Sequence, residues 1–64
     1  PGVPDRIVIT PAGRTVYVEL KTEAGRLAAI QKYQHEEIRK RGAEVRTLKG
    51  MDQVLAFVEE VFPA

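Results

Sequence analysis

A chain of 64 residues with no cysteine and one histidine is at most a single small domain, and it excludes disulfides and any thiolate- or histidine-rich metal site. Charged residues make up 30% of the chain but the net charge is only +1, which is an ordinary globular balance and excludes a strongly basic nucleic-acid-binding protein. No signal peptide is visible, and no apolar run approaches about 20 residues, the length of a membrane span. We therefore expect no membrane association and an intracellular, cytoplasmic protein.

The first part of the chain predicts an antiparallel hairpin. Residues 6–10 read as a short strand rich in β-branched side chains. Residues 11–14 read as a turn, in which Gly13 supplies the permissive backbone. Residues 15–21 read as a second strand, and strands separated by about four residues pair as a hairpin.

A helix and a third strand follow the hairpin. The helical period extends over residues 27–41, and Gly42 stands where a left-handed residue would end the helix. The residues whose spacing follows this period are Leu27, Ile30, Gln34, Ile38 and Arg41. Residues 43–48 then read as a strand, which Lys49 and Gly50 interrupt.

A second helix over residues 51–62 completes the predicted order. Its predicted inner face consists of Val54, Leu55, Val58 and Val61. A right-handed crossover through the first helix would make the second and third strands parallel. The sequence therefore predicts an α/β fold with a β-β-α-β-α order and a mixed sheet, over residues 1–64 as one domain.

The second strand carries the clearest chemical signal. Alternation places Val16, Val18 and Leu20 on one face, and Tyr17, Glu19 and Lys21 on the other. The apolar face should pack against a helix. A carboxylate and an ammonium that project together from the end of a strand indicate a site that is open to solvent or functional.

Asp5 should lie beside this charged pair, because a hairpin brings the start of its first strand next to the end of its second. Two neighbouring carboxylates, Asp5 and Glu19, repel each other unless a cation lies between them. Oxygen ligands favour Mg²⁺ or Mn²⁺, with the backbone carbonyl of Leu20 as a further candidate ligand. Lys21 could orient or deprotonate a water molecule, or neutralise charge on a phosphate.

These residues match a family pattern. The run Gly2-Val3-Pro4-Asp5, with a hairpin that ends in Val18-Glu19-Leu20-Lys21, resembles the PD-(D/E)XK nuclease superfamily and within it the VRR-NUC domain. The resemblance continues through Gly25-Arg26-Leu27, Gln31, His35-Glu36 and Arg41-Gly42, and covers the chain from Gly2 to Phe62. Such domains occur in small phage proteins and in DNA-repair nucleases.

The resemblance implies a divalent-metal-dependent DNA endonuclease with a restriction-endonuclease-like core. It implies that Asp5 and Glu19 bind the metal, that Lys21 is the catalytic lysine and that Gln31 lies near the active site. Stand-alone relatives look like homodimers that act on branched DNA, including four-way junctions. The alternative reading is a nuclease-fold module that binds DNA or forms a dimer without catalysis.

The resemblance also has a departure, because the family has a helix and a strand before the segment that begins at Gly2. We expect that these elements belong to the native protein or that a partner subunit covers the gap. Arg14, Arg26 and Lys32 are our candidate DNA-backbone contacts, since we expect the hairpin turn and the loop after the second strand to flank the site.

Three side chains had competing readings. Gln31 could also be a capping or solvated residue, and Glu23 could be a third carboxylate or a solvated loop residue. We expect His35 to be a surface residue of the first helix, with a role as general acid as the minor alternative.

Overall fold

Two strands, a helix, a strand and a helix follow one another in the computed structural model, which describes residues 3–63. They are β1 (Arg6–Ile9), β2 (Thr15–Lys21), α1 (Ala29–Lys40), β3 (Glu44–Lys49) and α2 (Gly50–Val61). The predicted order is therefore confirmed, with boundaries displaced by one or two residues. No helix in the described part of the chain has both the length and the apolar character to cross a membrane.

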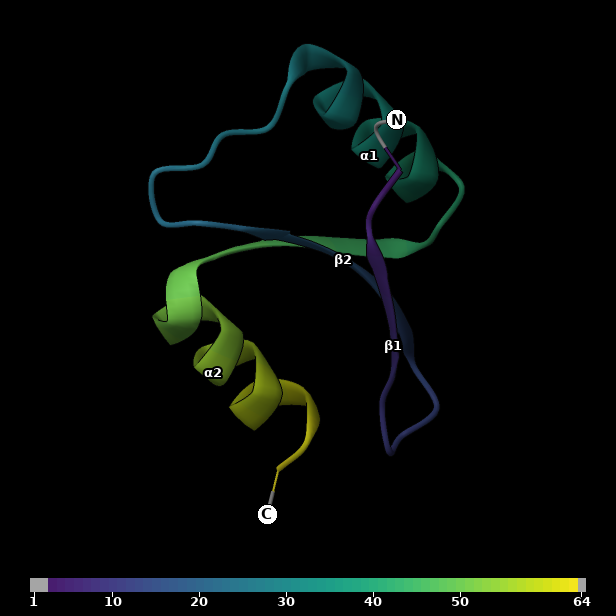
Figure 1. Cartoon of the computed structure of the whole chain (residues 1–64). Helices are drawn as coiled ribbons and strands as arrows, with labels where there is room; N and C mark the ends of the chain where they lie inside the picture. The colour runs from purple at the N-terminus through teal and green to yellow at the C-terminus, as the bar shows by residue number, and fades with distance from the viewer. Residues whose placement is uncertain (1–2, 64) are drawn as a thin grey trace.

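The sheet is mixed, with β2 between β1 and β3 (Figure 1). β1 and β2 form the predicted antiparallel hairpin, whose pairing runs from Ile9 opposite Thr15 to Arg6 opposite Val18. β2 and β3 are parallel, as the crossover through α1 requires. α1 and α2 lie on opposite sides of this sheet, so each face of β2 meets a different helix.

The α2 side of the sheet contains the hydrophobic core. Its buried members are Val16, Val18, Leu48, Phe57 and Val61, with Val8 and Val54 packed against them. The predicted inner face of α2 was wrong at Leu55 and Val58, which are both exposed. The helix is rotated so that Phe57 points inward between Val54 and Val61, at three- and four-residue spacings.

Leu20 is a further correction on this side, because it is 37% exposed although it follows Val16 and Val18 in the alternation. Arg46 closes a different part of the core, with its guanidinium 5.5 Å from the centre of the Phe57 ring. It also pairs with the carboxylates of Glu44 and Glu60. Charged side chains therefore cover the edge of the core at Phe57.

α1 begins two residues later than predicted, at Ala29. Ala28 is still extended and has no side-chain oxygen with which to cap the helix. Instead, the Ala28 N–H donates to Oε1 of Gln31 at 2.9 Å. Gly42, with a φ of 90°, ends the helix in the left-handed conformation that the sequence predicted.

Candidate active site

The hairpin brings Asp5 to the end of β2. Arg6 opposite Val18 is the last pair of the ladder, so Asp5 and Glu19 flank it on the two strands. Oδ1 of Asp5 accepts a hydrogen bond from the backbone N–H of Leu20 at 3.3 Å. Asp5 is exposed, and this bond fixes its carboxylate beside the peptide group that joins Glu19 to Leu20.

Glu19 is the central carboxylate of this arrangement, and it is only 6% exposed. Its Oε1 is buried without a hydrogen-bond partner among the described residues. Its Oε2 lies 3.9 Å from Nζ of Lys21, the next residue along β2 on the same face. A buried carboxylate with one unpaired oxygen is costly unless a cation or a hydrogen-bond donor compensates it.

The site has few side-chain oxygens that could bind a metal ion. Within residues 3–63 there is no group of three or more His, Cys, Asp or Glu side chains arranged to hold a metal ion. Mg²⁺ keeps several water ligands and is commonly held by only one or two carboxylates. Asp5 and Oε1 of Glu19, which has no hydrogen-bond partner among the described residues, are the two carboxylates that could hold such an ion.

The loop after β2 covers Lys21 and leaves it half-buried. Gly25 makes this close approach, because a Cβ built on it would lie 3.1 Å from Cβ of Lys21 and 3.1 Å from the carbonyl oxygen of Thr22. A side chain at this position would require the neighbouring atoms to shift by a few tenths of an ångström. The predicted loop is thus a wall of the site.

His35 is fully buried, so the prediction of a surface histidine was wrong. α1 turns His35 towards the sheet and leaves Ile30 49% exposed. Neither ring nitrogen of His35 has a hydrogen-bond partner among residues 3–63. Two polar side chains, Glu19 and His35, are thus buried on the side of the sheet that α1 covers.

The pKa of His35 lies below its ordinary value, chiefly because burial disfavours the charged ring. The charge of Glu19 opposes this shift, whereas the cations Arg39 and Lys21 add to it. His35 is therefore neutral at pH 7, with one ring nitrogen as a donor and the other as an acceptor.

Gln31 lies one turn before His35 on α1. Its Oε1 accepts the hydrogen bond from Ala28 described above, so its amide serves the start of the helix. This is the capping role that the sequence left open. The amide oxygen is engaged there, and the nitrogen of the same group remains a donor.

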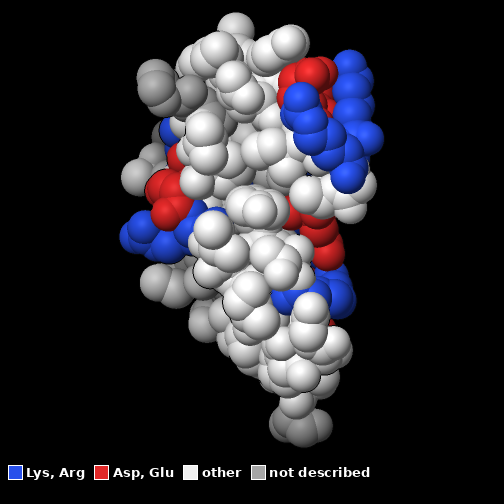
Figure 2. Space-filling view, turned by 90° about the vertical axis from the view of Figure 1, so that its right-hand side faces the viewer, with Lys and Arg blue, Asp and Glu red and all other residues white. Residues whose placement is uncertain are grey.

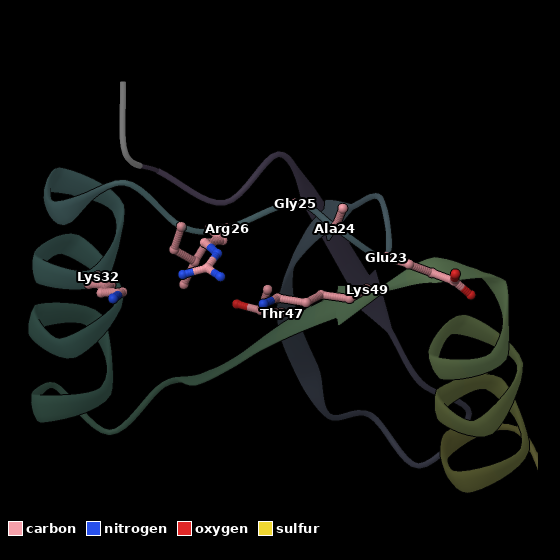
Figure 3. Close-up of a pocket in the computed structure, with 8 residues that line it drawn as sticks. Glu23, Ala24, Gly25, Arg26, Lys32, Thr47 and Lys49 are labelled. Atoms are coloured by element: carbon pink, nitrogen blue, oxygen red, sulfur yellow. The ribbon is translucent and has the colours of Figure 1, made fainter.

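A cavity of about 550 Å³ opens at this end of the sheet. It is lined by Glu23, Ala24, Gly25, Arg26, Leu27, Lys32, Thr47 and Lys49 (Figure 3). Glu23 turns away from its centre and towards α2, where its side chain occupies the space above Gly50. Glu23 is therefore not a third carboxylate beside Asp5 and Glu19.

Two of the three predicted DNA contacts, Arg26 and Lys32, line this cavity, but Arg14 does not. Arg14 precedes β2, at the end of the sheet opposite the Glu19 end, and pairs with both carboxylate oxygens of Glu44 at 2.8 and 2.9 Å. The expectation that the hairpin turn flanks the site was wrong. The turn joins the strand ends that lie farthest from Asp5.

The sequence also missed Thr47 and Lys49. In the parallel ladder, Thr47 is paired with Glu19 and Lys49 with Lys21. The parallel pairing was predicted, but its register was not, and only the register identifies which β3 residues lie beside the charged pair. The lysine directly after the third predicted strand was the available signal.

Comparisons with protein-family models, with curated proteins and with solved structures find no match to this chain.

Proposed function

We propose that this protein is a divalent-metal-dependent DNA endonuclease of the VRR-NUC type, with a restriction-endonuclease-like core. The observation that carries the proposal is the meeting of Asp5 and Glu19 at one end of the hairpin, with Lys21 beside them. Carboxylates from two strands and a lysine from one of them form a compact set for phosphodiester hydrolysis.

Asp5, Glu19 and the backbone carbonyl of Leu20 would hold Mg²⁺ or Mn²⁺. When bound, the metal would polarise a phosphate oxygen and lower the pKa of a water molecule. Lys21 is held near Glu19, and its ammonium can stabilise negative charge that develops on the phosphate. Gln31 would support the site from the start of α1 without touching the reacting atoms.

The proposed substrate is branched DNA, including four-way junctions, and the proposed active form is a homodimer. Arg26 and Lys32 support DNA contact beside the carboxylates. Ile7 and Ile9 are 63% and 62% exposed on the edge strand β1. Figure 2 shows a broad area without charged side chains on this side, which supports a second subunit there.

The test is cleavage of labelled four-way junctions and linear duplexes with Mg²⁺ or Mn²⁺. Asp5→Asn and Lys21→Met should each lower the cleavage rate by about 100-fold or more, because the first removes a charged metal ligand and the second removes the ammonium that stabilises negative charge in the transition state. Lys40→Met is the matched control, since Lys40 is an exposed residue in the last turn of α1. Cleavage that persists in both site variants would rule out this active site.

The burial of Glu19 supports a second candidate, a nuclease-fold module that binds DNA without cutting it. Calorimetric titration with Mn²⁺ separates the two. The enzyme requires binding that Glu19→Gln abolishes and Glu59→Gln, a change at an exposed α2 residue, leaves intact. DNA binding with no Glu19-dependent uptake of Mn²⁺ supports the non-catalytic module.

A further inference from the structure

Three basic side chains from three separate elements meet at the cavity beside Lys21. Arg26 comes from the loop after β2, Lys32 from the first turns of α1, and Lys49 from the end of β3. Figure 3 shows Arg26 and Lys49 reaching into the same space near Thr47, with Lys32 across from them on α1. Such a cluster of cations attracts an anion.

Within residues 3–63, no ion pair neutralises these three cations, Arg26, Lys32 and Lys49. The one carboxylate in the lining, that of Glu23, turns towards Gly50. Elsewhere on the molecule, in contrast, Arg14, Arg39 and Arg46 all pair with glutamates.

The position of the cavity also favours an anionic ligand. It lies at the carboxyl ends of the parallel strands β2 and β3, which is where open α/β sheets bind ligands. The first turn of α1 borders it and contains no acidic residue, so the positive end of the helix dipole is not offset there. The hydroxyl of Thr47 adds a neutral donor.

We infer that this cavity binds one phosphate group of the DNA strand, next to the phosphate that the carboxylate pair would act on. The inference rests on the proposed function for the location of the cut. Thr47 and Lys49 pair with Glu19 and Lys21, and adjacent strands lie about 4.8 Å apart. A DNA strand that crosses from β2 to β3 therefore passes from the carboxylate pair to the cavity.

The experiment measures binding of a short fluorescent single-stranded DNA with hydroxyl ends, by anisotropy, in EDTA and at several salt concentrations. Lys49→Gln should weaken binding about tenfold, because it removes a charge-assisted hydrogen bond to phosphate. It should also reduce the slope of log K against log salt by about 0.7, the value for one lost contact on a single strand. Lys32→Gln should act in the same direction.

Lys40→Gln is the matched control, because Lys40 lies in the last turn of α1 and pairs with Glu37. Circular dichroism establishes that each variant is folded. Equal affinities and slopes for Lys49→Gln and Lys40→Gln would overturn the inference. So would inorganic phosphate that binds as tightly as the DNA strand, because the ligand would then be the free anion.

The same conditions separate this inference from the proposed function. EDTA removes any dependence on a metal, and Asp5→Asn should bind the strand at least as well as the unmodified chain, since it loses a negative charge near the DNA. If DNA binding depends on Lys49 but neither the unmodified chain nor any variant cleaves DNA, the phosphate site is supported and the endonuclease is ruled out. If the chain cleaves DNA but its DNA binding does not depend on Lys49, the endonuclease is supported and the phosphate site is ruled out.

Discussion

The two faces of β2 bury different chemistry. On the α2 side, Val16 and Val18 pack against Phe57, and the buried side chains are apolar. On the α1 side, Glu19 and His35 are buried, and each has polar atoms without a hydrogen-bond partner in the described part of the chain. Burial of apolar side chains stabilises the fold, whereas burial of a carboxylate or imidazole that lacks a hydrogen-bond partner destabilises it. The α2 side thus provides the stability that offsets the cost of these polar groups on the α1 side.

The largest expected effect breaks the α2 side of this comparison. Phe57→Ala should lower the free energy of unfolding by about 3–5 kcal/mol, because it empties the space that the ring fills in the core. That is a large part of the stability of so small a domain. Urea unfolding followed by circular dichroism measures it.

Leu55→Ala is the control on the same helix, since Leu55 is 54% exposed. Its effect should be within about 0.5 kcal/mol, as is usual for surface substitutions. Equal losses for the two variants would contradict the orientation of α2. Such a result would mean that Leu55 lies on the inner face of α2, as the sequence predicted.

The next effect has the opposite sign, and it sharpens the comparison. His35→Met replaces the buried ring with an apolar side chain of adaptable shape, so the free energy of unfolding should rise by about 1 kcal/mol. A loss of several kcal/mol would mean that the ring nitrogens are well compensated in the folded protein. Leu48→Ala, on the α2 side, should destabilise in the same assay.

His35 also predicts a dependence on pH. Its folded pKa lies below its unfolded value of about 6.5, so the unfolded chain takes up the proton first. The stability that depends on neutral His35 should be fully present above about pH 6.5 and should be lost as the pH falls through the folded pKa of His35. Urea unfolding over this range should show the loss in the unmodified chain and a smaller loss in His35→Met.

The smallest effect concerns Arg14, which lies apart from the site. Arg14→Gln breaks an exposed ion pair with Glu44 and should cost at most about 1 kcal/mol. Its affinity for DNA should equal that of the unmodified chain, while Arg26→Gln should bind more weakly. Anisotropy with the same DNA strand measures both. A larger loss for Arg14→Gln would place the DNA across the hairpin turn.

Local sequence patterns predicted the elements and their order well. The β-branched runs, the turn at Gly13 and the cap at Gly42 act over a few residues, so their effects can be read from the sequence. The rotation of the helices could not be read in this way. α2 offers apolar residues at more than one helical spacing, and only packing against the sheet selects Phe57 over Leu55.

In the candidate site, too, the local contacts could be predicted from the sequence and the non-local contacts could not. Asp5 and Glu19 could be paired from the sequence, because a tight hairpin leaves little freedom in its register. Lys49 could not be paired with Lys21, since the register of a parallel pair depends on how the whole crossover packs. His35 was misread for a similar reason, because nothing local indicates that α1 turns a polar residue inward.

The hairpin and the parallel pair also differ in the length of chain that each must close. The β1–β2 pairing is local in sequence, and hairpins form within about 1–10 μs. The β2–β3 pairing waits for α1 and the crossover, and non-local pairing of this kind is slow. Folding should therefore bring Asp5 to Glu19 early and add Lys49 late. A chain halted between these steps would present the two carboxylates without Lys49 and Thr47 beside them.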